Sequence, residues 1–214
     1  SHHAAGRYAD EAKPGWWDKF IGDGKAIDTT KYFVICSNTI GSSYGSTNPL
    51  SINPSTKTEY RLKFPVITIS DIVKAQMKLY ERLGIKNAVA VVGGSMGGMQ
   101  ALCYSIEYPT FAKHIIALAT TAYTRPWVIG INKIAIEAIR HDKIFNNGNY
   151  KKEDLKALGL PGLAVGRMAG LMMYLSPNLF KNKFGRDYVT TDGLYELFGR
   201  FEVEKYLEYN SYSF

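Results

Sequence analysis

One apolar run that breaks at glycines around a single serine constrains this chain more than any other stretch. The run begins at Val89, and Gly93 and Gly97 flank Ser95 in a G-x-S-x-G pattern. In this pattern the serine sits on a tight turn between a strand and a helix, with its hydroxyl above the sheet. Glycines are needed because the strained serine backbone leaves no room for a Cβ atom two residues before or after it. The stretch therefore predicts a buried strand over 88–92 followed by a nucleophile elbow.

The residues after the serine predict the helix that the elbow requires. An apolar helix is expected from Met96 through 100–108, and Pro109 stops it. The free N–H groups at its start would point at the place where a developing oxyanion sits. The alternative is a glycine-rich turn that binds phosphate or only packs. The sequence favours the elbow, because both G-x-G-x-x-G and the P-loop lysine are absent.

Composition is typical of a water-soluble protein of one or two domains. The chain has 214 residues, of which 46% are hydrophobic and 21% are charged. No apolar run approaches the roughly 20 residues that span a bilayer, and no signal-peptide pattern opens the chain. Cys36 and Cys103 both lie in apolar segments, which indicates buried free thiols in a reducing compartment. We therefore expect a cytoplasmic protein with no membrane contact.

The net charge of +7 does not indicate nucleic-acid binding. The 26 lysines and arginines are spread along the chain without a basic block or an interleaved aromatic platform. An anionic small-molecule partner is the milder implication. His2 and His3 lack a third ligand nearby in the sequence, so we expect a polar loop pair there and no metal site.

The first half of the chain reads as alternating strands and helices. Residues 1–30 are loop-like, and Trp16, Trp17 and Phe20 are expected to anchor a short helical turn against the core. Residues 31–37 predict a buried strand of a parallel sheet. The Gly/Ser/Asn-rich loop over 38–49 follows its carboxyl end and is either a ligand-binding loop or a plain connection.

Two further elements complete the predicted sheet. Ser70 is expected to cap a crossover helix that carries Asp71 in its first turn and ends at Gly84. Residues 114–120 predict a third parallel strand. The resulting βαβαβ order indicates an α/β fold with a mostly parallel sheet and helices on both faces. We assign this core to residues 1–122.

The strand pattern stops beyond residue 121, and residues 123–214 predict a helical cap over the sheet. Helices are expected over 131–140, 153–158, 163–174 and 195–209. The chain begins without methionine and ends just after an amphipathic segment, so we expect it to be cut at both ends.

One predicted cap helix has an unusual face. Gly162, Gly166 and Gly170 recur every four residues, which lets another backbone approach closely within the cap or at a subunit interface. Dimerisation in a membrane is disfavoured because Arg167 lies in so short a segment. If buried, Arg167 needs a counter-charge and could clamp a substrate carboxylate; otherwise its guanidinium extends to solvent.

A serine nucleophile needs a base and a group that orients that base. Only His114 and His141 follow Ser95. His114 opens its predicted strand, well over about 10 Å from the catalytic edge at about 3.3 Å per residue. His141 ends a cap helix beside Asp142 and is expected to be solvated. We predict that these residues do not complete a catalytic triad.

Five segments resemble one known enzyme family, in family order and over nearly the whole chain. They are SNTIGSSYGSTNPLSINP, FPVITISDIVKAQMKLYERLGIKN, VVGGSMGGMQAL, GLAVGRMAGLMMYLS and FGRFEVEKYLEY. Together they closely resemble the homoserine O-acetyltransferases, enzymes of methionine biosynthesis with an α/β-hydrolase fold. The resemblance implies that Ser95 takes an acetyl group from acetyl-CoA, a co-substrate, and passes it to the hydroxyl of L-homoserine without a further cofactor.

The resemblance also implies roles for other residues. The backbone N–H of Met96 would supply half of the oxyanion hole, and Arg167 matches the family's arginine that holds the amino-acid carboxylate. Tyr174 stands seven residues later, where the family also has a tyrosine. The family's second oxyanion donor lies before residue 1, and its aspartate and histidine lie after residue 214. A homodimer through the cap helices is expected, and these 214 residues alone are expected to be inactive.

Other functions remain open at this point. The same scaffold could transfer succinyl, use serine as the acceptor, or hydrolyse esters. Exclusion of water from the acyl-enzyme by a closed cap would separate a transferase from an esterase. A non-enzymatic scaffold or dimerisation piece with a vestigial elbow is the remaining alternative.

Overall fold

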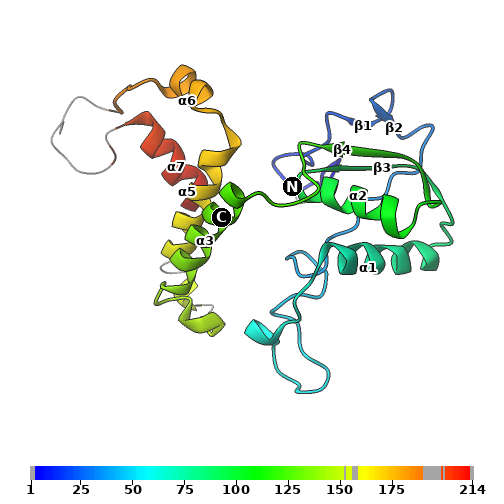
Figure 1. Cartoon of the computed structure of the whole chain (residues 1–214), viewed down its shortest axis with the longest axis horizontal. Coiled ribbons are helices and arrows are strands. Elements are labelled where there is room, and N and C mark those ends of the chain that lie inside the picture. The colour runs from blue at the N-terminus through cyan, green and yellow to red at the C-terminus, as the bar shows by residue number, and fades with distance from the viewer. Residues whose placement is uncertain (1–2, 152, 156–158, 190–198, 200, 213–214) are drawn as a thin grey trace. The chain divides into compact units, whose positions relative to one another are not determined.

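The chain folds as two compact units, Ser1–Ala122 and Tyr123–Phe214 (Figure 1). The computed structural model describes residues 3–151, 153–155, 159–189, 199 and 201–212. The first unit contains the parallel strands and the helices between them, and the second unit is helical. His2, for which a loop was predicted, lies outside the described residues.

A pair of parallel strands forms the centre of the first unit. Strand β3 (Ala88–Gly94) pairs with strand β4 (Ala112–Leu118) in a register that runs from Ala88 opposite Ala112 to Gly94 opposite Leu118. Helix α2 (Met96–Glu107) connects the two strands and packs on both of them. Helix α1 (Ile69–Arg82) packs against α2 on the same side of the strand pair (Figure 1). The predicted strand, elbow helix and following parallel strand are therefore confirmed, with slightly different bounds.

A small apolar core holds α1 and α2 to the strands. Val73, Tyr104 and Phe111 are buried and form its centre. The Tyr104 hydroxyl donates to Gln76 Oε1 at 3.0 Å, and Gln76 Nε2 donates to Gln100 Oε1 at 2.9 Å. Burial raises the pKa of Tyr104 above its usual range. The polar chain thus ties α1 to the helix that follows the elbow.

Helix α1 starts two residues earlier than the sequence predicts. The N-cap is Thr68, not Ser70: Asp71 N donates to Thr68 Oγ1 at 3.2 Å, and Thr68 N donates to Asp71 Oδ2 at 2.9 Å. This reciprocal pair is a capping box with aspartate at the third helical position. Hydrogen bonds from Thr68 hold the pKa of Asp71 below its usual value. Gly84, with a φ of +72°, follows the helix as predicted.

The strand predicted over 31–37 is wrong. These residues have no strand assignment, and Phe33 is 85% exposed. A strand needs a hydrogen-bonded neighbour, and the strand pairs among the described residues do not include this segment. Cys36 is consequently exposed rather than buried, whereas Cys103 is partly buried, and both are free thiols.

The rest of the amino-terminal region is mostly irregular, as predicted. Short parallel strands β1 (Ile21–Gly22) and β2 (Ile27–Asp28) pair with each other, and a short 3₁₀ helix, η1, covers Arg61–Lys63. The expected helical turn is a series of turns, and Trp16 and Phe20 are mostly exposed rather than anchored in the core. Residues 38–49 form a loop.

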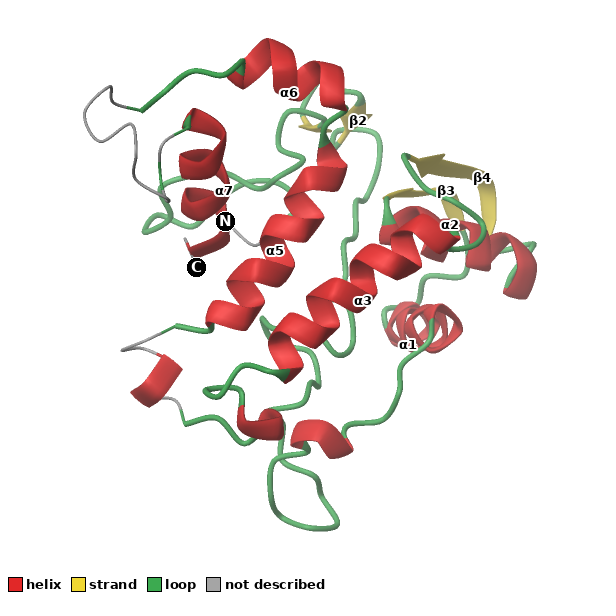
Figure 2. Cartoon of the chain, turned by 60° about the vertical axis from the view of Figure 1, so that its left-hand side comes forward, coloured by secondary structure: helices red, strands yellow, loops and turns green. Residues whose placement is uncertain are grey.

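The second unit consists of helices joined by loops (Figure 2). Where the structure describes this unit, its elements include α3 (Pro126–Arg140), the short 3₁₀ helix η2 (Asn146–Gly148), α5 (Pro161–Tyr174), α6 (Pro177–Phe184) and α7 (Glu202–Tyr212). Residues 153–155, which begin a predicted helix, are also helical. Helix α5 packs along α3 and also contacts α7. Helix α3 begins five residues before the predicted start because Pro126 occupies its first turn. Residues 156–158, 195–198 and 200 of two predicted helices lie outside the described residues.

Two glycines allow α5 to lie very close to α3. A Cβ atom at Gly162 would overlap the Ala138 carbonyl, and one at Gly166 would lie 3.3 Å from the Ala135 Cβ. Gly170 faces open space. Asp142 fixes the same end of the contact, since its Oδ2 accepts a hydrogen bond from Gly162 N at 2.7 Å. The small-residue face predicted from the sequence thus packs within this unit at two of its three glycines.

This packing gives a matched pair of substitutions. We expect Gly162→Ala to lower the free energy of unfolding by about 1–3 kcal/mol, because the added methyl meets backbone. Gly170→Ala should instead raise it by about 0.5–1 kcal/mol, since alanine favours helix and nothing obstructs it. Urea unfolding of both variants measures the difference. Equal effects of the two substitutions would contradict the close approach at Gly162.

Candidate active site

The elbow predicted around Ser95 is present at the carboxyl end of β3. Ser95 has φ 54° and ψ −120°, a conformation that side-chain-bearing residues rarely adopt, and it is the N-cap of α2. The residue is exposed. A strained backbone of this kind costs on the order of 1–3 kcal/mol and is retained where the surroundings hold it. Ser95 is therefore accessible at the turn, as a nucleophile requires.

Hydrogen bonds on both sides hold the Ser95 backbone. Its N–H donates to the Leu118 carbonyl at 3.0 Å. Its carbonyl accepts from the N–H groups of Gly98 and Met99 at 3.0 and 3.2 Å, and from Thr120 Oγ1 at 2.7 Å. The end of β4 and the first turn of α2 therefore both fix the turn.

The glycines around Ser95 differ in what they permit. A Cβ atom at Gly93 would overlap the carbonyl of Gly97, as the sequence predicts for the position two residues before the serine. Nothing lies within 4 Å of a Cβ atom at Gly97, so the same prediction for the position two residues after the serine is wrong. The crowded position on that side is Gly98, where a Cβ atom would lie 2.6 Å from Thr120 Cγ2. The α2 helix thus approaches the strand ends through Gly98.

Met96 is the first residue of α2, and the residue is 48% exposed. The N–H groups of a first helical turn have no acceptor inside the helix and carry the positive end of its dipole. The Met96 N–H is therefore placed to donate to an anion beside Ser95. Its role as an oxyanion donor stays a prediction.

The two histidines that follow Ser95 lie away from it or in the other unit. His114 is exposed and pairs with Ala90 near the amino-terminal ends of β3 and β4. It precedes Leu118, the partner of Ser95, by four strand residues, or roughly 13 Å. His141 ends α3 in the second unit, where its Nδ1 lies 2.9 Å from the Glu137 carbonyl. Hydrogen bonding from Lys133, with the charges of Arg140 and His141, lowers the pKa of Glu137.

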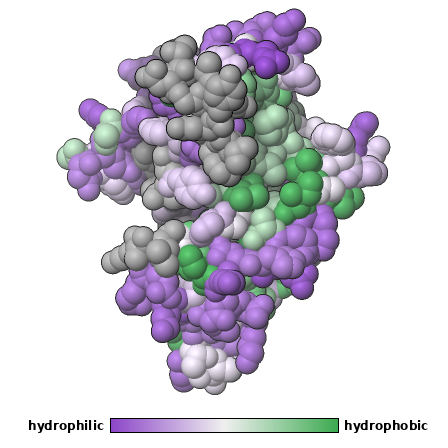
Figure 3. Space-filling view, turned by 90° about the vertical axis from the view of Figure 1, so that its left-hand side faces the viewer, coloured by the Kyte–Doolittle hydropathy of each residue, from purple (hydrophilic) through white to green (hydrophobic). Residues whose placement is uncertain are grey.

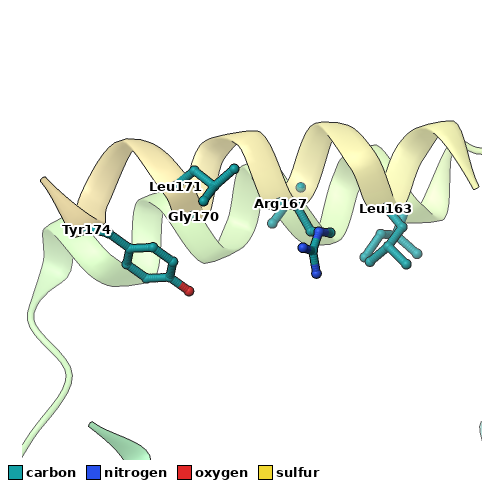
Figure 4. Close-up of a pocket in the computed structure, with 8 residues that line it drawn as sticks. Leu163, Arg167, Gly170, Leu171 and Tyr174 are labelled. Carbon is teal, nitrogen blue, oxygen red and sulfur yellow. The ribbon is translucent and has the colours of Figure 1, made fainter. Parts of the chain in front are cut away.

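The second unit contains a pocket of about 310 Å³ between α3 and α5. Figure 4 shows Arg167 and Tyr174 projecting from the same side of α5, as residues seven positions apart on a helix do. The lining is Ala135, Ile139, Leu163, Gly166, Arg167, Gly170, Leu171 and Tyr174. A mostly apolar wall with one guanidinium and one phenol suits a small molecule that carries a carboxylate.

Arg167 also has a structural contact. Its Nη2 donates to the Asn210 carbonyl of α7 at 2.6 Å, and the side chain is partly buried. This bond links α5 to α7 next to the pocket. Ser95 and Met96 thus belong to the first unit, and Arg167 and Tyr174 to the second.

Sequence reasoning missed two residues that fix these sites. Thr120 bonds to the carbonyl of Ser95, and Asp142 bonds to the N–H of Gly162. Thr120 could have been found from the sequence, because it is a polar residue at the end of the predicted strand that follows the elbow. The sequence around Asp142 offers no such signal beyond its place after a helix.

The part of the chain that the structure describes contains no group of three His, Cys, Asp or Glu side chains that could hold a metal ion. None of its helices has the length and apolar character that a membrane span needs.

Comparison with known proteins extends this picture. A family model described as alpha/beta hydrolase fold matches residues 12–153. A curated homoserine O-acetyltransferase of Sulfurimonas autotrophica is 62% identical over 214 residues, which are all of this chain and 58% of the relative. The chain thus spans little more than half the length of that relative. The resemblance to homoserine O-acetyltransferases found in the sequence is confirmed.

Solved structures are similar to the chain over almost all of its length. The X-ray structure of a homoserine O-acetyltransferase from Bacillus anthracis is 32% identical, with a TM-score of 0.87, and covers 99% of this chain and 58% of its own. The crystal structure of esterase E22 is 35% identical, with a TM-score of 0.85, over 100% of this chain and 60% of its own.

Proposed function

The chain belongs to the alpha/beta hydrolase fold family, and on this basis we propose that it carries the nucleophile of an acyltransferase that moves an acetyl group from acetyl-CoA to the hydroxyl of L-homoserine. The observation that carries the proposal is the exposed, strained Ser95 at the start of α2. The name of the relative from Sulfurimonas autotrophica supports the choice of donor and acceptor.

The reaction has two steps in which Ser95 first gains and then loses the acetyl group. Ser95 Oγ attacks the thioester carbonyl, the carbon–sulfur bond breaks, and coenzyme A leaves as a thiol with the proton that the serine gives up. The homoserine hydroxyl then attacks the acetyl-serine ester, the bond to Ser95 Oγ breaks, and the serine regains a proton. The N–H of Met96 stabilises the oxyanion of each tetrahedral intermediate. No cofactor beyond the co-substrate is required.

In this proposal the pocket of the second unit binds homoserine. The guanidinium of Arg167 offers two parallel donors that match a carboxylate, and the hydroxyl of Tyr174 offers a further polar contact. The apolar lining offers contacts for the amino acid's carbon chain. Binding through the carboxylate leaves the hydroxyl at the other end of homoserine free to react.

A labelling experiment tests the proposal. The protein, at the length the cell makes, is incubated with acetyl-CoA, and the peptide that contains Ser95 is weighed by mass spectrometry. We expect one added acetyl group on Ser95, and its loss on addition of L-homoserine with formation of O-acetylhomoserine. Succinyl-CoA as donor and L-serine as acceptor are the matched comparisons. A preference for either of them would replace the proposed substrates.

An esterase is the second candidate, because esterase E22 has a similar structure. An esterase and a transferase share the acyl-serine intermediate and differ in what removes the acyl group. Rapid loss of the adduct in water, with no acceleration by homoserine, would support the esterase. Persistence of the adduct until homoserine is added supports the transferase.

Arg167→Lys should separate the two steps. We expect this change to weaken the use of homoserine by roughly 1–3 kcal/mol, because an ammonium replaces a planar two-donor fork. Formation of the acetyl-enzyme should be affected much less. Stopped-flow measurement of each half-reaction tests this, with Arg140→Lys on the exposed side of α3 as the control. Equal losses in both half-reactions would assign Arg167 to holding α7 through Asn210.

We further propose that the protein acts in the cytoplasm, in methionine biosynthesis. We also propose that it forms a homodimer through the second unit. Free cysteines support a reducing compartment. Large apolar side chains are exposed on α3 and α5, and Figure 3 shows hydrophobic patches on a face that is otherwise largely hydrophilic. They include Trp127, Ile134, Ile136, Val165 and Met172. Exposed apolar surface of this kind supports an interface between subunits, and sedimentation velocity would measure it.

A further inference from the structure

The carbonyl of the strained serine has a side-chain partner that comes from a different part of the sequence. Thr120 Oγ1 donates to it at 2.7 Å from just beyond the end of β4, 25 residues along the chain. The preceding residue, Ala119, has a φ of 45°, an uncommon value for a residue with a side chain. Two strained residues therefore lie at the ends of neighbouring strands, and this hydrogen bond joins their segments.

The bond completes a set of constraints on both sides of the Ser95 peptide. Ser95 N donates to the Leu118 carbonyl at 3.0 Å, so the main chain of β4 fixes one side. The other side is the carbonyl, which the N–H groups of Gly98 and Met99 and the Thr120 hydroxyl hold together. Gly98 and Met99 use backbone N–H groups, whereas Thr120 uses its side-chain hydroxyl. It is therefore the partner that a substitution can remove without changing the main chain.

We propose that Thr120 is a positioning residue for the nucleophile, and that its hydroxyl holds the Ser95 backbone in the conformation that aims Oγ at the acyl carbonyl. The inference rests on the proposed function in assigning Ser95 as the nucleophile. The rate of acyl transfer depends on the position of Ser95 Oγ relative to the acyl carbonyl, because a displacement of about 1 Å in a reacting group costs on the order of 10²-fold in rate. A bond to the carbonyl of the nucleophile's own residue acts directly on that position.

Thr120 has a second contact that could explain its presence without this role. Its Cγ2 lies 2.6 Å from the position of a Cβ atom at Gly98, so its methyl group fills the space that the glycine leaves. Two substitutions separate the contacts. Thr120→Val keeps the shape and loses the hydroxyl, and Thr120→Ser keeps the hydroxyl and loses the methyl group.

The experiment measures the rate at which Ser95 is acetylated in the protein at the length the cell makes. The probe is 4-nitrophenyl acetate, an activated ester whose burst of 4-nitrophenol reports the serine's reactivity whatever its natural donor is. We expect Thr120→Val to slow the burst by about 10- to 100-fold, with little change in the ester concentration at half-maximal rate. Thr120→Ser should retain most of the rate. Thr110→Val, in the exposed turn before β4, is the control.

The opposite pattern would overturn the inference. A wild-type burst in Thr120→Val, or an equal loss in Thr120→Ser, would assign Thr120 to packing against Gly98. If Thr120→Val does not fold, Thr120→Cys, which replaces the hydroxyl by a weak donor, is measured in its place with the same expected slowing. Failure of the proposed function has a different signature: acetyl-CoA leaves Ser95 unlabelled although 4-nitrophenyl acetate labels it. If neither reagent labels Ser95, both proposals are wrong.

Discussion

Replacement of Ser95 by alanine should lower the rate of acetyl transfer by about 10⁴-fold or more, the loss that follows removal of a catalytic nucleophile. The free energy of unfolding should change by less than about 0.5 kcal/mol, as for other exposed positions. The Ser95 side chain is exposed, and the hydrogen bonds of this residue that hold the turn use its backbone. Alanine keeps those backbone bonds and removes the hydroxyl alone.

Thiol release from acetyl-CoA in the presence of homoserine measures the rate, and thermal unfolding measures the stability. Ser105→Ala is the matched control, because Ser105 lies on α2 and its hydroxyl bonds only locally, to the Leu102 carbonyl at 2.7 Å. It should react at the wild-type rate. Full activity of Ser95→Ala, with the acetyl adduct on another residue, would remove Ser95 from the mechanism.

A second large effect is expected at the glycine that precedes the serine by two residues. Gly93→Ala should destabilise the protein by about 3 kcal/mol or more, the upper end for an added buried methyl group, because its Cβ would overlap the Gly97 carbonyl. The obstacle is backbone of α2, which cannot move without distorting the turn. Most of the protein is therefore expected in inclusion bodies, and the soluble remainder should melt at a lower temperature.

Gly97→Ala is the control within the same five-residue pattern. Nothing lies within 4 Å of a Cβ atom at Gly97, and this residue is inside α2, so alanine should stabilise the helix by up to about 1 kcal/mol. Expression level and melting temperature distinguish the two variants. Comparable destabilisation by both substitutions would contradict the geometry of the turn.

Local patterns explain why the elbow could be predicted from the sequence. The strand, the glycines and the helix start lie within about a dozen consecutive residues, and their conformations depend mainly on one another. The α3 and α5 helices were also predictable, because their apolar residues recur at helical spacing. Helix α6 was missed because it is short, although Ser176 before Pro177 is a helix-start signal.

Two of the failures depend on contacts between residues that are distant in the sequence, and one depends on where a helix begins. The apolar residues around Phe33 resemble a strand, but a strand also needs a neighbour that pairs with it. The sequence predicts Ser70 as the N-cap of α1, but Thr68 is the N-cap, because the reciprocal hydrogen bonds between Thr68 and Asp71 start the helix at Ile69. The bond from Thr120 to Ser95 joins positions 25 apart, and only the parallel register of β3 and β4 brings them together.

The contact between Gly162 and the Ala138 carbonyl has a consequence for how the second unit opens. Interlocked side chains usually separate two packed helices, and here the two backbones approach each other without a side chain between them. A shift of either helix by one residue would bring a side chain to the position of Gly162, where a Cβ atom overlaps the Ala138 carbonyl, so we expect α3 and α5 to separate together. In native-state hydrogen exchange their amides would then form one cooperative unit with a shared opening free energy.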